Sequence, residues 1–239
     1  HAKSPAVSGG YVDIGGASFY RISNYDSMQP FFMTLVSPSD HWLFVSSNGG
    51  LTAGRVCPEN NLFPYVTVDK IIENSRTTGP LTLVFAKSAG KSFLWEPFAT
   101  DCPQVYETER NLYKNVIGNE VVFEEINKSL GLSFRSSWML SDKFGFVRRA
   151  SIRNISGRKI KVELLDGLQN ILPANVDRNL QTGSSCLLDA YKKADLDEGT
   201  GMGVFFLNSI PSDKTEPLES LKATVVWSEG LSRPIHLLS

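Results

Sequence analysis

Apolar side chains recur at every second position between residues 130 and 165, and this alternation is the clearest pattern in the chain. A period of two predicts extended strands that bury one face and expose the other. The alternation is interrupted at two polar turns, at residues 141–143 and 154–157. It therefore predicts three strands joined by short turns in an antiparallel meander.

Further short segments are rich in β-branched and aromatic residues and are bounded by Gly, Pro, Asn or Ser, which is typical of strands. These predicted strands are residues 31–36, 41–46, 65–72, 81–86, 121–126, 203–208 and 221–228. Helical periodicity is nearly absent. Residues 104–116 fit a helical turn or two, and residues 169–179 fit a long loop. The pattern predicts an all-β fold, a large antiparallel two-sheet sandwich with few short helices.

The length of 239 residues permits a single domain, because sandwiches of about 200–250 residues are common. We therefore expect one β-sandwich domain over residues 1–239. Cys57, Cys102 and Cys186 are widely spaced and have no histidine nearby. This spacing argues against a zinc site and a disulfide framework. We predict three buried free thiols, no metal and no cofactor.

The charge is nearly balanced, with 24 Lys and Arg against 25 Asp and Glu. No net field attracts nucleic acid or an anionic membrane, so a neutral partner fits better. No apolar run approaches the roughly 20 residues of a membrane span. The chain begins at His1 without a signal-peptide core, and we expect that its original start has been removed. The compartment stays open, with the cytoplasm favoured over the periplasm.

Two glycine motifs resemble nucleotide-binding loops but lack the required context. Residues 89–92 read AGKS, and the position that a phosphate loop fills with glycine is Phe85. Residues 199–203 read GTGMG and precede a strand, whereas a dinucleotide loop follows one. We predict a hairpin turn at Gly90 and a flexible turn at residues 199–203.

The sequence offers no convincing catalytic set. The histidines are His1, His41 and His236, and no GxSxG accompanies them. Glu124 and Glu125 are neighbours on a predicted strand and point to opposite faces, so they cannot flank one sugar together. We predict no catalytic residue in this chain.

Three residues are candidates for carbohydrate binding. Arg148 is in register with apolar residues of its strand, which places its guanidinium on the apolar face. There it needs a carboxylate or polar partner, or it contacts a ligand. Trp42 and Trp95 lie near turns and could stack on sugar rings, with core packing as the alternative. Trp138 follows the core alternation, and we expect it to be buried.

Residues 41–55, HWLFVSSNGGLTAGR, resemble an early segment of the cellobiose phosphorylase family and related glycoside phosphorylases. In that family a strand enters a Ser-Asn-x-Gly-Gly turn. Ser47, Asn48, Gly49 and Gly50 supply a similar turn that lacks the small insert. The Trp and Pro of FLWEPF and the segment FGFVRRASIRNISGRKIKVELLDGLQ are also similar to family segments. The resemblance is patchy and covers most of residues 30–230.

The resemblance implies a super-sandwich of the galactose mutarotase-like kind that precedes a helical barrel. In that family the barrel holds the general acid and binds phosphate. We therefore expect this chain to be an accessory, non-catalytic N-terminal fragment of a longer glycoside phosphorylase or hydrolase, inactive alone. Its expected partners are carbohydrate, a C-terminal helical catalytic domain absent from this chain and, as a further candidate, a second copy in a homodimer. The alternatives are a free-standing mutarotase-like enzyme using His41 and His236, and a carbohydrate-binding module.

Overall fold

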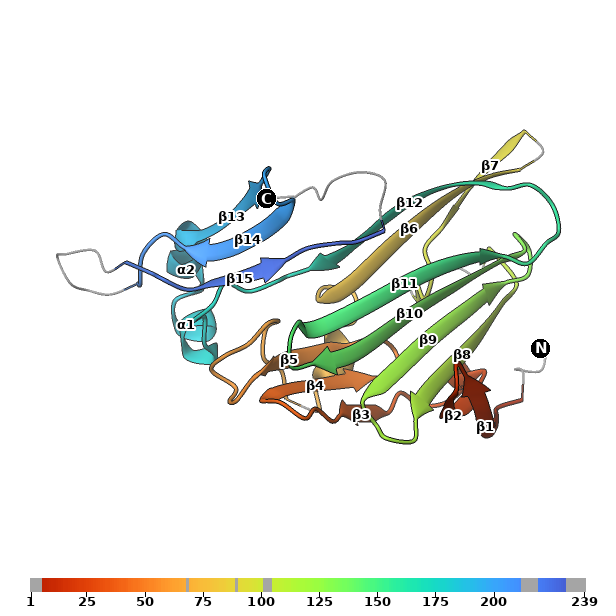
Figure 1. Ribbon diagram of the computed structural model, residues 1–239, viewed down its shortest axis with the longest axis horizontal. Helices are drawn as coiled ribbons and strands as arrows, with labels where there is room; N and C mark the ends of the chain where they lie inside the picture. The colour runs from red at the N-terminus through yellow and green to blue at the C-terminus, as the bar shows by residue number, and fades with distance from the viewer. Residues whose placement is uncertain (1–5, 68, 89, 101–104, 212–218, 231–239) are drawn as a thin grey trace. The chain divides into compact units, whose positions relative to one another are not determined.

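The computed structural model describes residues 6–67, 69–88, 90–100, 105–211 and 219–230. Antiparallel strands dominate these ranges, and the α-helices in them are two short ones (Figure 1), so the predicted all-β sandwich is confirmed. The chain divides into two compact units, whereas a single domain was expected from the sequence. Unit 1 comprises His1–Leu51 and Val68–Gln169, and unit 2 comprises Thr52–Thr67 and Asn170–Ser239.

A six-stranded antiparallel sheet is the largest element of unit 1, in the order β1-β2-β8-β9-β10-β11. Alternation along its strands separates an inner face, which packs on a second sheet, from an outer face. The strands are β1 (Ser8–Ile14), β2 (Ala17–Ser23), β8 (Thr108–Asn115), β9 (Glu120–Asn127), β10 (Leu132–Ser141) and β11 (Gly145–Asn154).

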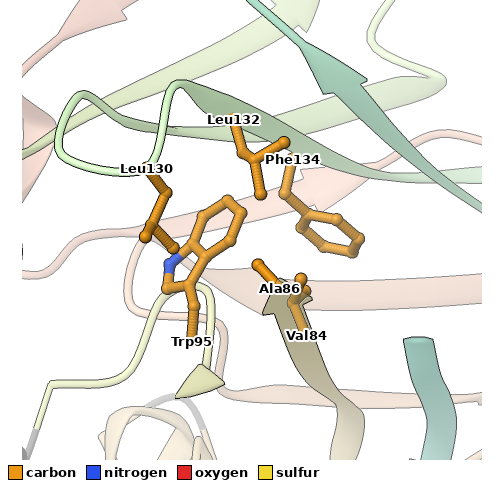
Figure 2. Close-up of a cluster of buried hydrophobic side chains, with 6 residues drawn as sticks. All are labelled: Val84, Ala86, Trp95, Leu130, Leu132 and Phe134. Atoms are coloured by element: carbon orange, nitrogen blue, oxygen red, sulfur yellow. The ribbon is translucent and has the colours of Figure 1, made fainter. Parts of the chain in front are cut away.

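The second sheet of unit 1 has the order β12-β6-β7. Its strands are β6 (Gly79–Ser88), β7 (Lys91–Trp95) and β12 (Lys161–Gln169). Buried side chains from the two sheets form one core cluster (Figure 2), in which each fully buried large side chain contributes about 1.5–3 kcal/mol. The cluster consists of Val84, Ala86, Trp95, Leu130, Leu132 and Phe134.

The predicted three-stranded meander is half correct. β10 and β11 pair as the alternation predicts, with Phe134 opposite Ile152. β12 instead pairs with β6 in the other sheet. Val162 and Leu164 of β12 pack against the core cluster from that sheet. Alternation determines which side of β12 is buried, but it does not determine its partner strand.

Other local predictions also need correction. Residues 65–72 contain no strand in their described part, and a 3-10 helix, η2 (Ile71–Asn74), begins there. The predicted helical turn within 104–116 is strand β8, whose Leu112 is buried in the sheet.

The hairpin turn at Gly90 is confirmed, because β6 pairs with β7 in a register that sets Ser88 opposite Lys91. The turn predicted at 199–203 is confirmed for residues 199–201, which join β13 (Lys192–Asp197) to β14 (Met202–Leu207), whereas Met202 and Gly203 already belong to β14.

A small sheet of unit 1 contains β3 (Phe32–Leu35) and β4 (His41–Ser46), and a 3-10 turn, η1 (Tyr25–Ser27), precedes it. The Gly49-Gly50 turn follows β4. Gly49 adopts a φ of +91°, and a Cβ at Gly50 would lie 1.9 Å from the Ile71 carbonyl oxygen. Only glycine fits both positions without strain.

Unit 2 holds β5 from Thr52 onward and a sheet in the order β13-β14-β15. Its remaining elements are α1 (Arg178–Gly183), α2 (Ser185–Tyr191) and β15 (Ala223–Val226), and β5 as a whole spans Leu51–Arg55. Its core cluster consists of Leu172, Val176, Leu188 and Leu207. Among the described residues, no helix combines the length and apolar character that a membrane span requires.

The cysteines agree with the prediction in pairing but not in burial. Cys57 and Cys186 are free thiols, as predicted. Cys186 is exposed and Cys57 is half-buried, so the prediction that they are buried is wrong. Cys186 lies on the short helix α2, where only Leu188 turns into the core. Cys102 lies outside the described residues.

Candidate functional site

Arg148 lies on the inner face of β11 and pairs with Asp166 of β12. Its Nη1 donates to Asp166 Oδ2 at 2.6 Å, and its Nη2 donates to Asp166 Oδ1 at 2.9 Å. The Nε donates to Ser136 Oγ at 3.1 Å, and Thr82 accepts a longer bond of 3.4 Å. The two charged side chains are 10% and 13% exposed. Asp166 is the carboxylate partner that the inward-pointing Arg148 requires. The two side chains pair in the bidentate geometry that arginine favours.

A cavity of about 80 Å³ opens beside Arg148 within unit 1. This volume holds roughly five to eight water molecules at about 10–15 Å³ each. Both aromatic and planar polar side chains line the cavity. The aromatic ones are Tyr25, Phe98, Phe123, Phe134 and Trp138, and the planar polar ones are Asn48, Arg76, Glu96, Arg148 and Gln169.

The aromatic side chains contact one another. Phe98 lies with its ring centroid 6.2 Å from that of Phe123 and 6.0 Å from that of Phe134. Tyr25 packs edge to face on Phe123 at 6.2 Å. Burial raises the pKa of the Tyr25 phenol far above its usual range, so the phenol stays protonated. The cavity therefore has a continuous apolar wall.

Glu125 holds that wall in place. Its carboxylate accepts bonds from Trp95 Nε1 at 2.7 Å, from the Phe98 backbone N–H at 2.7 Å and from Arg110 Nε at 2.8 Å. Glu125 is 1% exposed. Phe98 has a φ of +66°, which is unusual for a bulky residue. The bond that its N–H donates to the Glu125 carboxylate stabilises this strained conformation, and Phe98 lines the cavity.

The rim of the cavity carries a second ion pair and the glycine turn. Arg76 pairs with Glu96, and both side chains are partly exposed. Asn48 donates from Nδ2 to the Ile72 carbonyl at 2.9 Å. Asn48 and Gly49 line the cavity. The turn that carries the family resemblance therefore borders this cavity.

The candidate tryptophans occupy different environments. Trp95 is 2% exposed and belongs to the core cluster, so we treat it as a core residue. Trp42 is half-buried on β4, with its ring centroid 5.4 Å from that of Phe44. Carbohydrate binding by Trp42 stays a prediction. Trp138 is 2% exposed, as predicted, and contributes to the cavity wall.

His41, the histidine within the described residues, does not line the cavity. His41 accepts or donates a bond at Nδ1 with Ser39 Oγ at 2.7 Å, and its ring packs on Phe146. His41 is not among the residues that line the cavity. His236 lies outside the described residues. Within the described part of the chain, no group of three or more His, Cys, Asp or Glu side chains could hold a metal ion.

The role of Glu125 as the organising carboxylate was not predicted from the sequence. Its partners Trp95, Phe98 and Arg110 are 15–30 positions away. These partners reach Glu125 only because β8 pairs with β9 and because β7 packs near β9 in the fold. No local sequence pattern predicts these contacts. The register of Arg148 was a local signal that led to the cavity.

No family model matches the chain, and no curated protein matches it either.

Proposed function

We propose that this chain is an accessory, non-catalytic sandwich domain of a glycoside phosphorylase-like or hydrolase-like enzyme, and that its cavity binds one sugar ring. The observation that carries the proposal is the cavity itself. An apolar ring face of a sugar packs on aromatic side chains, while its hydroxyls bond to planar polar groups. The cavity has both kinds of surface, and Arg148 is fixed at it by Asp166.

A second observation supports the accessory role. The outer face of the β12-β6-β7 sheet exposes Leu165, Leu94 and Phe85, which are 56%, 53% and 43% exposed. An antiparallel sheet that faces water usually has polar residues on that side. Exposed apolar patches often mark interaction surfaces. We assign this face to contact with another part of the enzyme, in line with the family resemblance.

Titration calorimetry with glucose and cellobiose tests sugar binding. The informative variant is Arg148→Met/Asp166→Leu, because it removes both charges and leaves neither buried alone. We expect at least a tenfold loss of affinity, since the variant removes the fixed donor beside the cavity. Arg149→Met is the matched control, because the next residue of the same strand points to the outer face.

The control separates binding from folding. Arg149→Met should bind sugar as the wild type does, and both variants should keep a cooperative melting transition. Wild-type protein that gives no heat with either sugar at millimolar concentration would contradict the proposed site. Equal affinity of the double variant and the wild type would contradict the role of Arg148.

A further inference from the structure

Basic residues are concentrated in one segment of the chain. Residues 143–161 contain seven Lys and Arg and no Asp or Glu. The rest of the chain has 24 − 7 = 17 basic against 25 acidic residues, a net charge of −8. The segment covers β11 and the turn that leads into β12. The balanced total charge therefore conceals a local excess of positive charge on unit 1.

Strand alternation divides these charges between the two faces of the sheet. Arg148 points inward to Asp166, whereas Arg149 and Arg153 are on the outer face and exposed. Arg135 of β10 shares that face, because it lies opposite Ser151. It is a diagonal neighbour of both outer arginines, at about 7–8 Å. We name Arg135, Arg149 and Arg153 the basic strip.

Most of the charge on the strip is not neutralised. Arg135 donates from Nε to Glu124 Oε1 at 2.7 Å, and its side chain remains 43% exposed. Within the described ranges, the side chains of Arg149 and Arg153 form no ion pair and no hydrogen bond. Glu109, another acidic residue of this face, pairs with Lys128 at 3.3 Å. The strip thus presents two uncompensated guanidinium groups and a third that is held in place.

The geometry of the strip suits an extended anionic polymer. Arg149 and Arg153 are four residues apart on one strand, about 13 Å at roughly 3.3 Å per residue. A guanidinium fork matches a carboxylate with two parallel hydrogen bonds. Arg135 lies over the ring of Tyr113 at 5.7 Å, and this tyrosine is only 5% exposed, so its ring is not available to stack a nucleic acid base.

We propose that the basic strip binds a polysaccharide that carries carboxylate groups. The inference rests on the proposed carbohydrate function and extends it with a second site and with the charge of its ligand. The strip is on the outer face of the sheet, whereas Arg148 belongs to the inner face. The two sites can therefore be tested separately.

Affinity electrophoresis in gels containing carboxymethyl cellulose or hydroxyethyl cellulose tests the strip. The two polymers share a backbone and differ in charge. The wild type should be retarded by carboxymethyl cellulose alone, and less so as salt rises. Arg149→Glu/Arg153→Glu should weaken that binding at least tenfold. The control Lys193→Glu/Lys222→Glu changes the total charge equally at exposed positions of unit 2 and should bind as the wild type does.

Three other outcomes would contradict the proposal that the basic strip binds carboxylate groups. Equal retardation by both polymers would mean that charge is not recognised. An equal loss in both charge-reversal variants would mean that only the total charge matters. Binding of single-stranded DNA as tight as that of carboxymethyl cellulose would identify a general polyanion surface. Glucose binding at the cavity, measured on the same variants, should equal that of the wild type. If the wild type binds no glucose, that result would count against the cavity site and not against the basic strip.

Discussion

The inner and outer faces of the six-stranded sheet use the same kinds of residue in opposite ways. Adjacent residues provide the comparison, because Glu125 and Arg148 turn inward while Glu124 and Arg149 turn outward. Glu125 is buried and receives bonds from three donors that fix the cavity wall. Arg149 is exposed and has no partner among the described residues. The inward Glu125 is therefore committed to the structure of the wall, whereas the outward Arg149 remains available.

Glu124 is an intermediate case on the outer face. It accepts bonds from Tyr113 Oη at 2.6 Å and from Arg135 Nε at 2.7 Å, and Asn111 donates a third at 3.1 Å. Burial acts to raise the pKa of Glu124, but the bonds from Tyr113 and Arg135 outweigh it and lower the pKa. Burial and the bond to Glu124 raise the pKa of Tyr113 to about 12. The lesson is that an outward carboxylate can be as fully bonded as an inward one, while its arginine partner stays half exposed.

The largest expected effect is that of Glu125→Gln. The substitution keeps the shape but removes the charge that neutralises Arg110, whose side chain is 13% exposed. Breaking a buried ion pair costs about 3–5 kcal/mol. Urea unfolding followed by tryptophan fluorescence measures the loss, and Trp95 reports directly because it donates to Glu125.

Glu124→Gln is the matched comparison and should have a smaller effect. Because water reaches Arg135, we expect a loss of only about 1–2 kcal/mol in the free energy of unfolding. An equal loss in both variants would break the distinction between the two faces.

The pH dependence of stability sharpens the same comparison. The folded pKa of Glu124 lies below its unfolded value of 4.5. Its contribution is therefore fully present above pH 4.5 and is lost as the pH falls toward the folded pKa. Between pH 6 and pH 3, Glu124→Gln should lose less stability than the wild type, as measured by urea midpoints. Parallel curves for the two proteins would show that Glu124 is not the linked group.

Period-two alternation was enough to predict the sandwich, the pairing of β10 with β11 and the inward position of Arg148. It could not predict that β12 joins β6, because alternation carries no information about the partner strand. It also did not separate Trp95 from Trp42, since the bond from Trp95 to Glu125 spans 30 residues. The charge segregation was visible in the sequence as the acid-free segment 143–161, but the total charge obscured it.

Chemical-shift mapping during a titration with glucose tests the central claim most directly. The claim is that the inner-face cavity, and not the outer face, binds a sugar ring. We expect the indole signal of Trp138 and the Nε–H signal of Arg148 to shift together with saturable dependence on glucose, while the Arg149 signal stays unchanged. Shifts confined to Trp42 or Arg149, or no shift at Trp138 and Arg148 at saturating sugar, would contradict the account.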